Sequence, residues 1–301
     1  MTHKLVAVIL VNFNSSQYTL NCLESIQNSS GKIPLYIIVV DNNSNGSSVD
    51  HVKRKFPGIH LLKLKTNLGF AGGVNAGINI AMKRGAGYVW ILNNDTILDK
   101  NAFSLVDAFI DPDIGGASSK IYFAPGHEYH KERYKNSDKG RVIWYAGGLI
   151  DWNNVYASNY MIDEVDNGQF TNPKDTDFLT GCSMMIPSHI IRKIGLFDEK
   201  YYLYYEDVDY SLRIQKLGMR TIYYPKSVVW HLNAASSGGP GSRLHEYYQT
   251  RNRLLFGFKY ASGRTKLALS REALRMAING TDNQRKAIID AAFGKFGKRY
   301  E

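Results

Sequence analysis

The first 120 residues alternate continuous apolar runs with helix-like segments, and this alternation constrains the fold more than any other feature of the chain. Apolar runs at 5–11 and 35–40 predict strands that are covered on both faces. Shorter strands are expected at 59–64 and 88–92, with helices between successive strands. Strand–helix–strand repetition with short connections predicts a mostly parallel sheet with helices on both faces. The sequence therefore predicts an α/β fold.

Composition and charge exclude several classes of protein. No apolar run approaches the roughly 18 residues that cross a bilayer, and two cysteines, Cys22 and Cys182, make no disulfide framework. We therefore expect a cytoplasmic protein. The net charge of +10 is concentrated after residue 250, where twelve Lys and Arg stand against four Asp and Glu. A nearly neutral body with a basic tail is not typical of a nucleic-acid enzyme.

Both standard nucleotide-binding fingerprints are absent. The first strand is followed by Asn12-Phe13-Asn14-Ser15-Ser16, which lacks the glycines of a dinucleotide-binding turn. The glycine-rich stretch at 67–77 follows the third strand instead, and no Walker lysine follows it. In parallel sheets ligands lie beyond the carboxyl ends of the strands. The polar segments 12–15, 41–45 and 93–96 are therefore the places where a ligand is expected.

Three groups of residues could carry chemistry. Asp95 ends the fourth strand and could hold a divalent cation, although an Asx-rich turn that caps a helix explains it equally well. Glu206 and Asp207 follow a cluster of tyrosines and begin a helix. They could complement the helix dipole, or aromatic rings beside them could raise a carboxyl pKa toward that of a general base. His231 gains a role as a ligand only if Asp95 supplies a cation to share.

Several segments, taken in their order and spacing, resemble inverting glycosyltransferases of family 2. They are VAVILVNFNSS, VVDNNS, NLGFAGGVNAGI, WILNNDT, FLTGCSMMIP, GLFDEKYYLYYEDVDYSLR, and VVWH followed by EYYQTRNRLL. The resemblance covers roughly residues 4–260 and is strongest to bacterial rhamnosyltransferases and galactofuranosyltransferases of cell-surface polysaccharide assembly. It implies a GT-A fold. We expect a catalytic domain at 1–240, with a nucleotide-binding half to about 120 and an acceptor half after it, and a basic helical extension at 241–301.

The resemblance also implies a role for individual residues. The implied donor site comprises Val11 and Phe13 at the pyrimidine base, Asp41 at the base or ribose, Asn67 in a loop at 67–75 that closes over the nucleotide, and Asn94 near the ribose or diphosphate. Asp95 and His231 would hold Mg²⁺ or Mn²⁺, and Asp207 would be the general base. Trp152, Gly181, Cys182 and Glu206 would line the sugar and acceptor pocket. The sequence departs from the family in having Asn93 and Asn94 where acids are usual, which should weaken cation binding.

The expected activity is inverting transfer of a sugar, rhamnose first, from a dTDP- or UDP-sugar to a glycan or polyprenyl-linked glycan. A UDP-dependent galactofuranosyl- or hexosyltransferase is the nearest alternative. A sugar-phosphate nucleotidyltransferase usually needs an early glycine-rich loop with a basic residue, and segment 12–16 has neither. A basic surface-binding module with a decayed active site is a third class, and Asp95, Asp207 and His231 argue against decay.

The basic tail has two interpretations. On a helix over 285–300, five apolar residues form one stripe between Lys and Arg side chains. They are Ile289, Ala292, Phe293, Phe296 and Tyr300. Such a helix could lie on the anionic inner face of the cell membrane, where lipid-linked acceptors are found. It could equally pack on the catalytic domain or on a second subunit in a homodimer.

Overall fold

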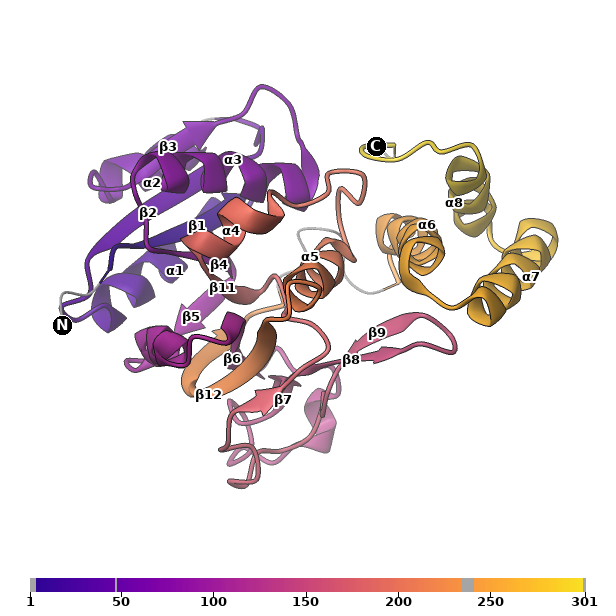
Figure 1. Ribbon diagram of the computed structural model, residues 1–301. Helices are drawn as coiled ribbons and strands as arrows, with labels where there is room; N and C mark the ends of the chain where they lie inside the picture. Colours follow the sequence, from indigo (N-terminus) through magenta and orange to yellow (C-terminus); the bar gives the residue numbers. More distant parts are fainter. Residues whose placement is uncertain (1–3, 47, 234–240, 300–301) are drawn as a thin grey trace.

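A ten-stranded mixed sheet forms the centre of the computed structural model, which describes residues 4–46, 48–233 and 241–299. Its parallel half is built from alternating strands and helices (Figure 1). They are β1 (Val6–Asn12), α1 (Ser16–Ser29), β2 (Leu35–Asp41), α2 (Ser48–Lys55), β3 (His60–Lys63), α3 (Gly69–Lys83) and β4 (Tyr88–Asn93). The alternation predicted from the apolar runs is thus confirmed.

The second half of the sheet is mixed, because β11 is antiparallel to β4 and β6 whereas β12 is parallel to β6. Its elements are β5 (Thr96–Leu98), η1 (Ala102–Ile110), β6 (Ile114–Phe123), η2 (Lys131–Arg133), β7 (Ile143–Tyr145), β8 (Gly148–Asp151), β9 (Tyr156–Asn159), β10 (Lys174–Asp175), β11 (Ser183–Pro187), α4 (Ser188–Ile194), α5 (Glu206–Gln215) and β12 (Arg220–His231). The strand order is β10-β12-β6-β11-β4-β1-β2-β3, with β5 paired to β12 and β7 to β6. Strands β8 and β9 form a separate hairpin.

Three helices follow the sheet, as the sequence predicts for its last 60 residues. They are α6 (Arg243–Tyr260), α7 (Gly263–Asn279) and α8 (Asp282–Ala292), and they lie together on the α5 side of the molecule (Figure 1). The helix predicted to continue to residue 300 instead ends at Ala292, and Tyr300 lies outside the described residues. Within the described ranges, no helix is both long enough and apolar enough to span a membrane.

The two faces of the sheet carry separate apolar cores. Val8 and Leu10 of β1 pack with α1, α2 and η1 on one face. Ala7 and Ile9 of the same strand pack with α3, α4 and α5 on the other face. Successive strand residues point to opposite faces, so a strand covered on both sides must be apolar throughout. This arrangement explains the unbroken apolar run with which the chain begins.

The glycine-rich segment differs from its prediction. We expected a loop at 67–75, but residues 69–75 are the first two turns of α3. Glycine is needed there for close packing, because a Cβ at Gly73 would lie 2.9 Å from Val11 and one at Gly77 would lie 2.5 Å from Ile9. The glycines therefore let α3 approach β1, and its amino terminus points at the same end of the sheet as the polar strand ends.

Candidate active site

The carboxyl ends of β1, β2 and β4 lie side by side. The register pairs Val11 with Asn93 and Asn12 with Asp41. The Asn12 amide donates to Asp41 Oδ1 at 2.9 Å. The Asn94 amide donates to the hydroxyl oxygen of Thr19 at 2.8 Å. Buried polar groups need such partners, and this network fixes the polar edge on which a ligand can rest.

Asp95 and His231 meet because β5 and β12 are antiparallel neighbours. The register pairs His231 with Thr96, and the Leu232 amide donates to the Asp95 carbonyl at 2.9 Å. His231 Nε2 lies 3.2 Å from Asp95 Oδ1, and both side chains are almost fully buried. The contact has the distance of an ion pair but not the geometry of a hydrogen bond. Among the described residues, neither ring nitrogen of His231 has a hydrogen-bond partner.

This pair fits one side of a divalent-cation site. Buried nitrogens without partners are costly, and a cation offers the missing partner to an imidazole nitrogen and a carboxylate oxygen together. A separation of 3.2 Å is one that two ligands of a single ion can have. No group of three or more His, Cys, Asp and Glu ligands occurs among the described residues. The chain would therefore supply two ligands and leave the other positions to a diphosphate and water.

The second pair of functional groups begins α5. Tyr205 has a left-handed backbone with φ 70°, and the helix starts at Glu206. Asp207 Oδ2 accepts a hydrogen bond from the Gly181 amide at 2.9 Å, and its Oδ1 accepts one from the Val208 amide at 2.8 Å. A Cβ at Gly181 would lie 2.9 Å from the ring of Phe70. Glycine therefore allows the backbone donor to approach the carboxylate.

Burial raises the pKa of both carboxyl groups in this pair. The pKa of Glu206 is held well above its usual range by burial first and by the charge of Asp207 second. Burial also raises the pKa of Asp207, but the Gly181 and Val208 amides act in the opposite direction. Glu206 Oε2 has no hydrogen-bond partner among the described residues. A shared proton therefore resides on Glu206, and Asp207 is the carboxylate.

A cavity of about 450 Å³ joins the two pairs. Its volume lies in the range of small-molecule sites. Ten of the predicted site residues line it: Val11, Phe13, Asn67, Asn94, Asp95, Gly181, Cys182, Glu206, Asp207 and His231. The structure thus brings together residues that are up to 220 positions apart in sequence, at the edge of the sheet where the strand ends predict a ligand.

Two predicted site residues are not among the residues that line the cavity. Asp41 is buried behind the cavity wall, where its carboxylate accepts hydrogen bonds from Asn12 and from the Ser44 hydroxyl. Trp152 lies in the turn after β8 and stacks on Phe256 of α6, with ring centroids 5.8 Å apart. The tryptophan is 40% exposed. Its contact joins the β8–β9 hairpin to the C-terminal helices rather than to the cavity.

Sequence reasoning missed several residues that shape the cavity. Asn42 lines it and pins the start of α3, because its amide donates to the Gly69 carbonyl and its Oδ1 accepts from the Leu68 amide. Trp144 lines it beside His231, with ring centroids 4.7 Å apart. His245 of α6 also lines it. The Asn-Asn pair after β2 was a usable signal for Asn42, whereas nothing local marks Trp144 or His245.

Comparisons with known proteins agree with this geometry. A model of the family described as glycosyltransferase like family 2 matches residues 3–257. An N-acetylglucosaminyl-diphospho-decaprenol L-rhamnosyltransferase of Mycobacterium tuberculosis is 24% identical over 256 residues, which are 81% of each chain. The dTDP-rhamnosyl transferase RfbF of Shigella flexneri is 20% identical over 83% of this chain and 79% of its own length.

A solved structure shows the same fold. The crystal structure of GalNAc-T7 with UDP, GalNAc and Mn²⁺ superposes with a TM-score of 0.64 at 15% identity. It covers 98% of this chain, and this chain spans 55% of that one. The family match extends over more than half of the sequence and over every strand of the sheet. The chain therefore belongs to glycosyltransferase family 2, and it is a glycosyltransferase with a GT-A fold.

Proposed function

We propose that the protein transfers a sugar, with inversion, from a pyrimidine nucleotide diphosphate sugar to a glycan or polyprenyl-linked glycan. One observation carries the proposal. The half-buried carboxylate of Asp207 faces the same cavity as the pair Asp95 and His231. A general base and a site for a leaving diphosphate are the two functions that such a transfer needs.

The donor would lie along the strand ends. Val11 and Phe13 offer apolar surface for a pyrimidine ring, and Asn67 and Asn94 offer polar atoms near the ribose and diphosphate. Asp41 would act through Asn12, whose amide it orients. Both named relatives are rhamnosyltransferases and one of them is named for dTDP, which supports dTDP-rhamnose as the first donor. A UDP-linked galactofuranose or hexose remains the alternative donor.

The chemistry follows from the arrangement of the acids. The acceptor hydroxyl attacks the anomeric carbon as the diphosphate leaves, through an oxocarbenium-like transition state. Asp207 takes the hydroxyl proton during the attack, a contribution of about 10²- to 10⁴-fold in rate. Glu206, as the protonated partner, can donate a hydrogen bond to a sugar oxygen. A single displacement inverts the anomeric centre and requires no enzyme nucleophile.

Asp95 and His231 would hold a divalent cation, Mg²⁺ or Mn²⁺, which neutralises the charge that collects on the leaving diphosphate. In the described part of the chain the ring nitrogens of His231 have no hydrogen-bond partner, which supports this assignment. Asn94 would contribute an amide group nearby, although its Nδ2 is already bonded to Ser15 and Thr19. The protein would supply only two ligands, one carboxylate and one imidazole. The site should therefore bind the cation weakly when no nucleotide is present.

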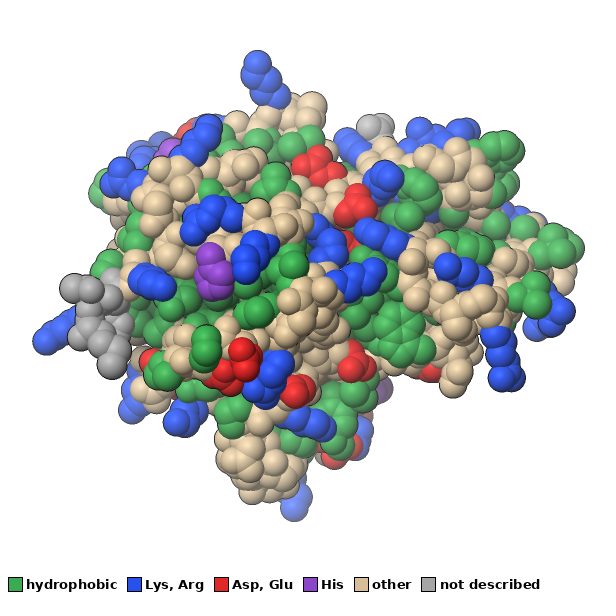
Figure 2. Space-filling view, viewed as in Figure 1, with side chains coloured by type: hydrophobic (Ala, Val, Ile, Leu, Met, Phe, Trp, Pro, Cys, Tyr) green, Lys and Arg blue, Asp and Glu red, His purple; other side chains and the backbone are tan. Residues whose placement is uncertain are grey.

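The acceptor would enter from the side of Gly181, Cys182 and Glu206. The mycobacterial relative is named for a decaprenol-linked diphosphate acceptor, and a similar acceptor would place this protein at a membrane surface. Helices α7 and α8 carry exposed apolar residues among exposed basic ones, and Figure 2 shows these types intermixed on that part of the molecule. The apolar residues are Leu267, Leu274 and Ile278 of α7, Ile289 of α8, and Phe293 directly after α8. Because Lys and Arg outnumber Asp and Glu in α7 and α8, an anionic membrane suits this surface.

Co-sedimentation with phosphatidylcholine vesicles, with and without phosphatidylglycerol, tests the membrane contact. We expect binding only with the anionic lipid, weakened by salt and lost when Leu274 and Ile278 are both changed to serine. Ile110→Ser is the control, because Ile110 is 80% exposed on η1 outside this surface. Equal binding by all variants would contradict the assignment. Loss of a dimer in the double variant, without vesicle binding by the wild type, would assign the surface to a second subunit.

Calorimetric titration with dTDP and UDP, each with and without Mg²⁺ or Mn²⁺, tests the donor site. We expect one nucleotide to bind more tightly with metal, and Asp95→Ala and His231→Ala to remove that gain. His51→Ala is the control, because His51 is exposed on α2 and lies outside the cavity. Metal-independent binding in the wild type would contradict the roles of Asp95 and His231. Absence of binding by either nucleotide would contradict the pyrimidine donor.

A further inference from the structure

The segment at 200–205, which leads into Glu206 and Asp207, has an unusual backbone. Tyr202, Tyr204 and Tyr205 have φ values of 64°, 70° and 70°. A left-handed conformation costs a non-glycine residue about 1–2 kcal/mol, so three in four positions persist only where neighbouring groups hold them. The contacts of this segment therefore decide where the following carboxylates lie.

One side of the segment is held by α3. The Tyr202 carbonyl accepts hydrogen bonds from the amides of Phe70 and Ala71, at 2.8 and 3.3 Å. These are amides of the first turn of a helix, which have no partner within the helix. Gly69 lies so close that a Cβ there would be 2.3 Å from the same carbonyl oxygen. The donor-side helix thus contacts the acceptor-side segment directly.

The other side is held by two adjacent residues of α6. The Asn252 amide donates to the carbonyls of Tyr201, Leu203 and Tyr204, at 2.8, 2.7 and 2.9 Å. Arg251 Nη2 donates to the carbonyls of Lys200 and Tyr201, at 3.0 and 2.9 Å. Both side chains are fully buried. We call Arg251 and Asn252 the carbonyl clamp.

The clamp is itself fixed within the molecule. Arg251 Nε donates to Asn252 Oδ1 at 3.0 Å, and Arg251 Nη1 donates to the Gly297 carbonyl at 2.7 Å. Its guanidinium lies 4.7 Å from the ring centroid of Tyr248 and 5.8 Å from that of Phe296. Burial lowers the pKa of Arg251, but carbonyls and aromatic faces still stabilise its charge. The segment after α8 thus contacts Arg251 through the Gly297 carbonyl and the ring of Phe296.

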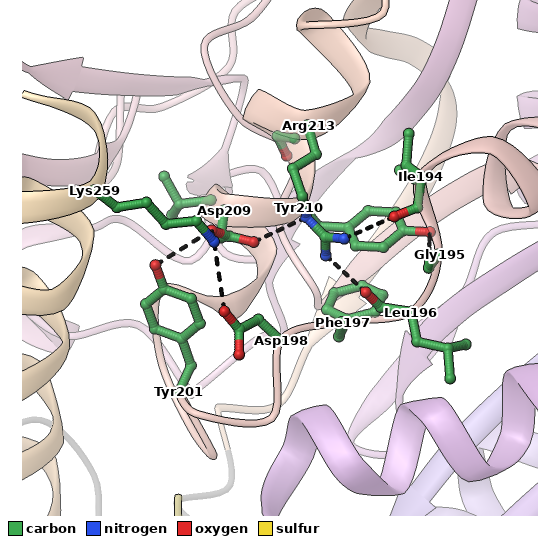
Figure 3. Close-up of polar contacts among 12 residues, drawn as sticks. Ile194, Gly195, Leu196, Phe197, Asp198, Tyr201, Asp209, Tyr210, Arg213 and Lys259 are labelled. Carbon is green, nitrogen blue, oxygen red and sulfur yellow. Dashed lines mark hydrogen bonds and ion pairs between the residues drawn. The ribbon is translucent and has the colours of Figure 1, made fainter. Parts of the chain in front are cut away.

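A second contact anchors α6 to α5 beyond the carboxylates. Asp209 is fully buried and accepts from Lys259 Nζ at 2.6 Å and from the Tyr260 hydroxyl at 2.8 Å. Figure 3 shows Lys259 of α6 reaching Asp209 of α5, with Arg213 of α5 on the other side of Asp209 and Asp198 and Tyr201 close by. Helix α6 therefore forms hydrogen bonds with the chain both before and after the Glu206–Asp207 pair.

We infer that Arg251 and Asn252 are positioning residues, which hold segment 200–205 in its strained backbone and thereby place Asp207 against the reacting hydroxyl. The inference rests on the proposed role of Asp207 as general base. All five of these hydrogen bonds go to four carbonyls just ahead of the two acids, those of Lys200, Tyr201, Leu203 and Tyr204. Neither clamp residue lines the cavity, so each acts through the backbone rather than on substrate.

Asn252→Ala is the first test, because it removes the amide nitrogen that contacts three carbonyls without changing any charge. A misplacement of about 1 Å can cost about 100-fold in rate, so we expect kcat to fall about 10- to 100-fold. Nucleotide affinity should change by less than about twofold, because the strand ends are untouched. Arg251→Lys keeps the charge, but a lysine cannot donate to all three carbonyls that Arg251 contacts. We expect a smaller decrease in kcat, again with little change in nucleotide affinity.

The pH profile separates positioning from a merely structural role. Burial raises the pKa of Asp207, so water admitted by a loosened segment should lower it and shift the acid limb of kcat to lower pH. The titratable groups that face Asp207 are Glu206, Cys182, Tyr145 and Tyr205. Burial raises the pKa of the last three, so only Glu206 exchanges protons with Asp207 in the acidic range. A variant that merely unfolds a fraction of the protein lowers the rate by that fraction, but the pKa of Asp207 in the molecules that remain folded does not move.

Arg253→Lys is the matched control. Arg253 lies next to the clamp on α6 and is 6% exposed, but it donates to the Asn154 carbonyl and pairs with Glu272. We expect it to lower the melting temperature as much as Arg251→Lys does without moving the acid limb. A fall in kcat with no shift of the limb, or the same shift in Arg253→Lys, would overturn the clamp.

Asp207→Asn distinguishes failure of the clamp from failure of the proposed base. If Asp207→Asn abolishes turnover while Asn252→Ala and Arg251→Lys leave the wild-type rate and pH profile unchanged, the base stands and the clamp is refuted. If Asp207→Asn retains the wild-type rate, the proposed base is refuted and the clamp falls with it.

Discussion

The carboxyl group of Glu206 is buried, and its Oε2 has no hydrogen-bond partner among the described residues. Glu206→Gln should therefore stabilise the protein at neutral pH. The side chain is 4% exposed, and burial followed by the charge of Asp207 holds its pKa well above the usual range. A carboxyl group with a raised pKa in the folded state contributes stability below its unfolded pKa of about 4.3. That contribution is lost as the pH rises through the folded pKa.

The magnitude follows from proton linkage. While the folded protein keeps the Glu206 proton that the unfolded chain has lost, the free energy of unfolding falls by about 1.4 kcal/mol per pH unit. Glutamine has the same shape and no titration. The difference in stability between Glu206→Gln and the wild type should therefore grow as the pH rises from 5 to 7, by at most about 1.4 kcal/mol per pH unit.

Urea unfolding at pH 5, 6 and 7, followed by tryptophan fluorescence, measures this difference. Glu132→Gln is the control, because Glu132 is exposed on η2 and its replacement should give a pH-independent difference. A difference between Glu206→Gln and the wild type that stays constant across this range would refute the reasoning. It would mean that Glu206 ionises in the folded protein as readily as in the unfolded chain.

Two glycine substitutions test the close approaches around the carboxylates. Gly69→Ala should lower the free energy of unfolding by about 2–4 kcal/mol in urea titrations, through the left-handed backbone and the contact with the Tyr202 carbonyl. Gly85→Ala has the same backbone strain in open space, so an equal loss there would contradict the importance of the contact. Gly181→Ala should lower kcat about tenfold by pressing on Phe70 and displacing the amide donor to Asp207. Activity assays should show partial rescue by adding Phe70→Leu, and lack of any effect would exclude the close approach.

The fold could be predicted largely because the residues of β1 pack into the apolar cores on both faces of the sheet. Successive residues of 6–10 point in turn to the helices on one face of the sheet and to those on the other. Their unbroken apolar character therefore indicates a strand in the middle of the sheet. The start of α3 could not be predicted in the same way. Glycine disfavours helices in general, and only the packing of Gly73 and Gly77 on β1 shows why this helix tolerates it.

The candidate site divides along similar lines. Asp95 and Asp207 could be found because polar residues at a strand end or helix start stand out locally. Arg251 and Asn252 could not, because a buried Arg-Asn pair inside a helix has no local signature of its partners about 50 residues earlier in the chain. Trp152 illustrates the opposite error. The family resemblance implied a place for it in the sugar and acceptor pocket, but the structure stacks it on Phe256.

The stereochemistry of transfer tests the central claim most directly. The protein would be incubated with dTDP-rhamnose, metal and a polyprenyl-diphosphate-linked glycan acceptor, and the new glycosidic bond examined by NMR. A single displacement with Asp207 as base predicts a product whose anomeric configuration is opposite to that of the donor, and predicts no product from Asp207→Asn. A product that retains the donor configuration would contradict the mechanism, because retention requires either a second displacement or attack from the leaving-group face.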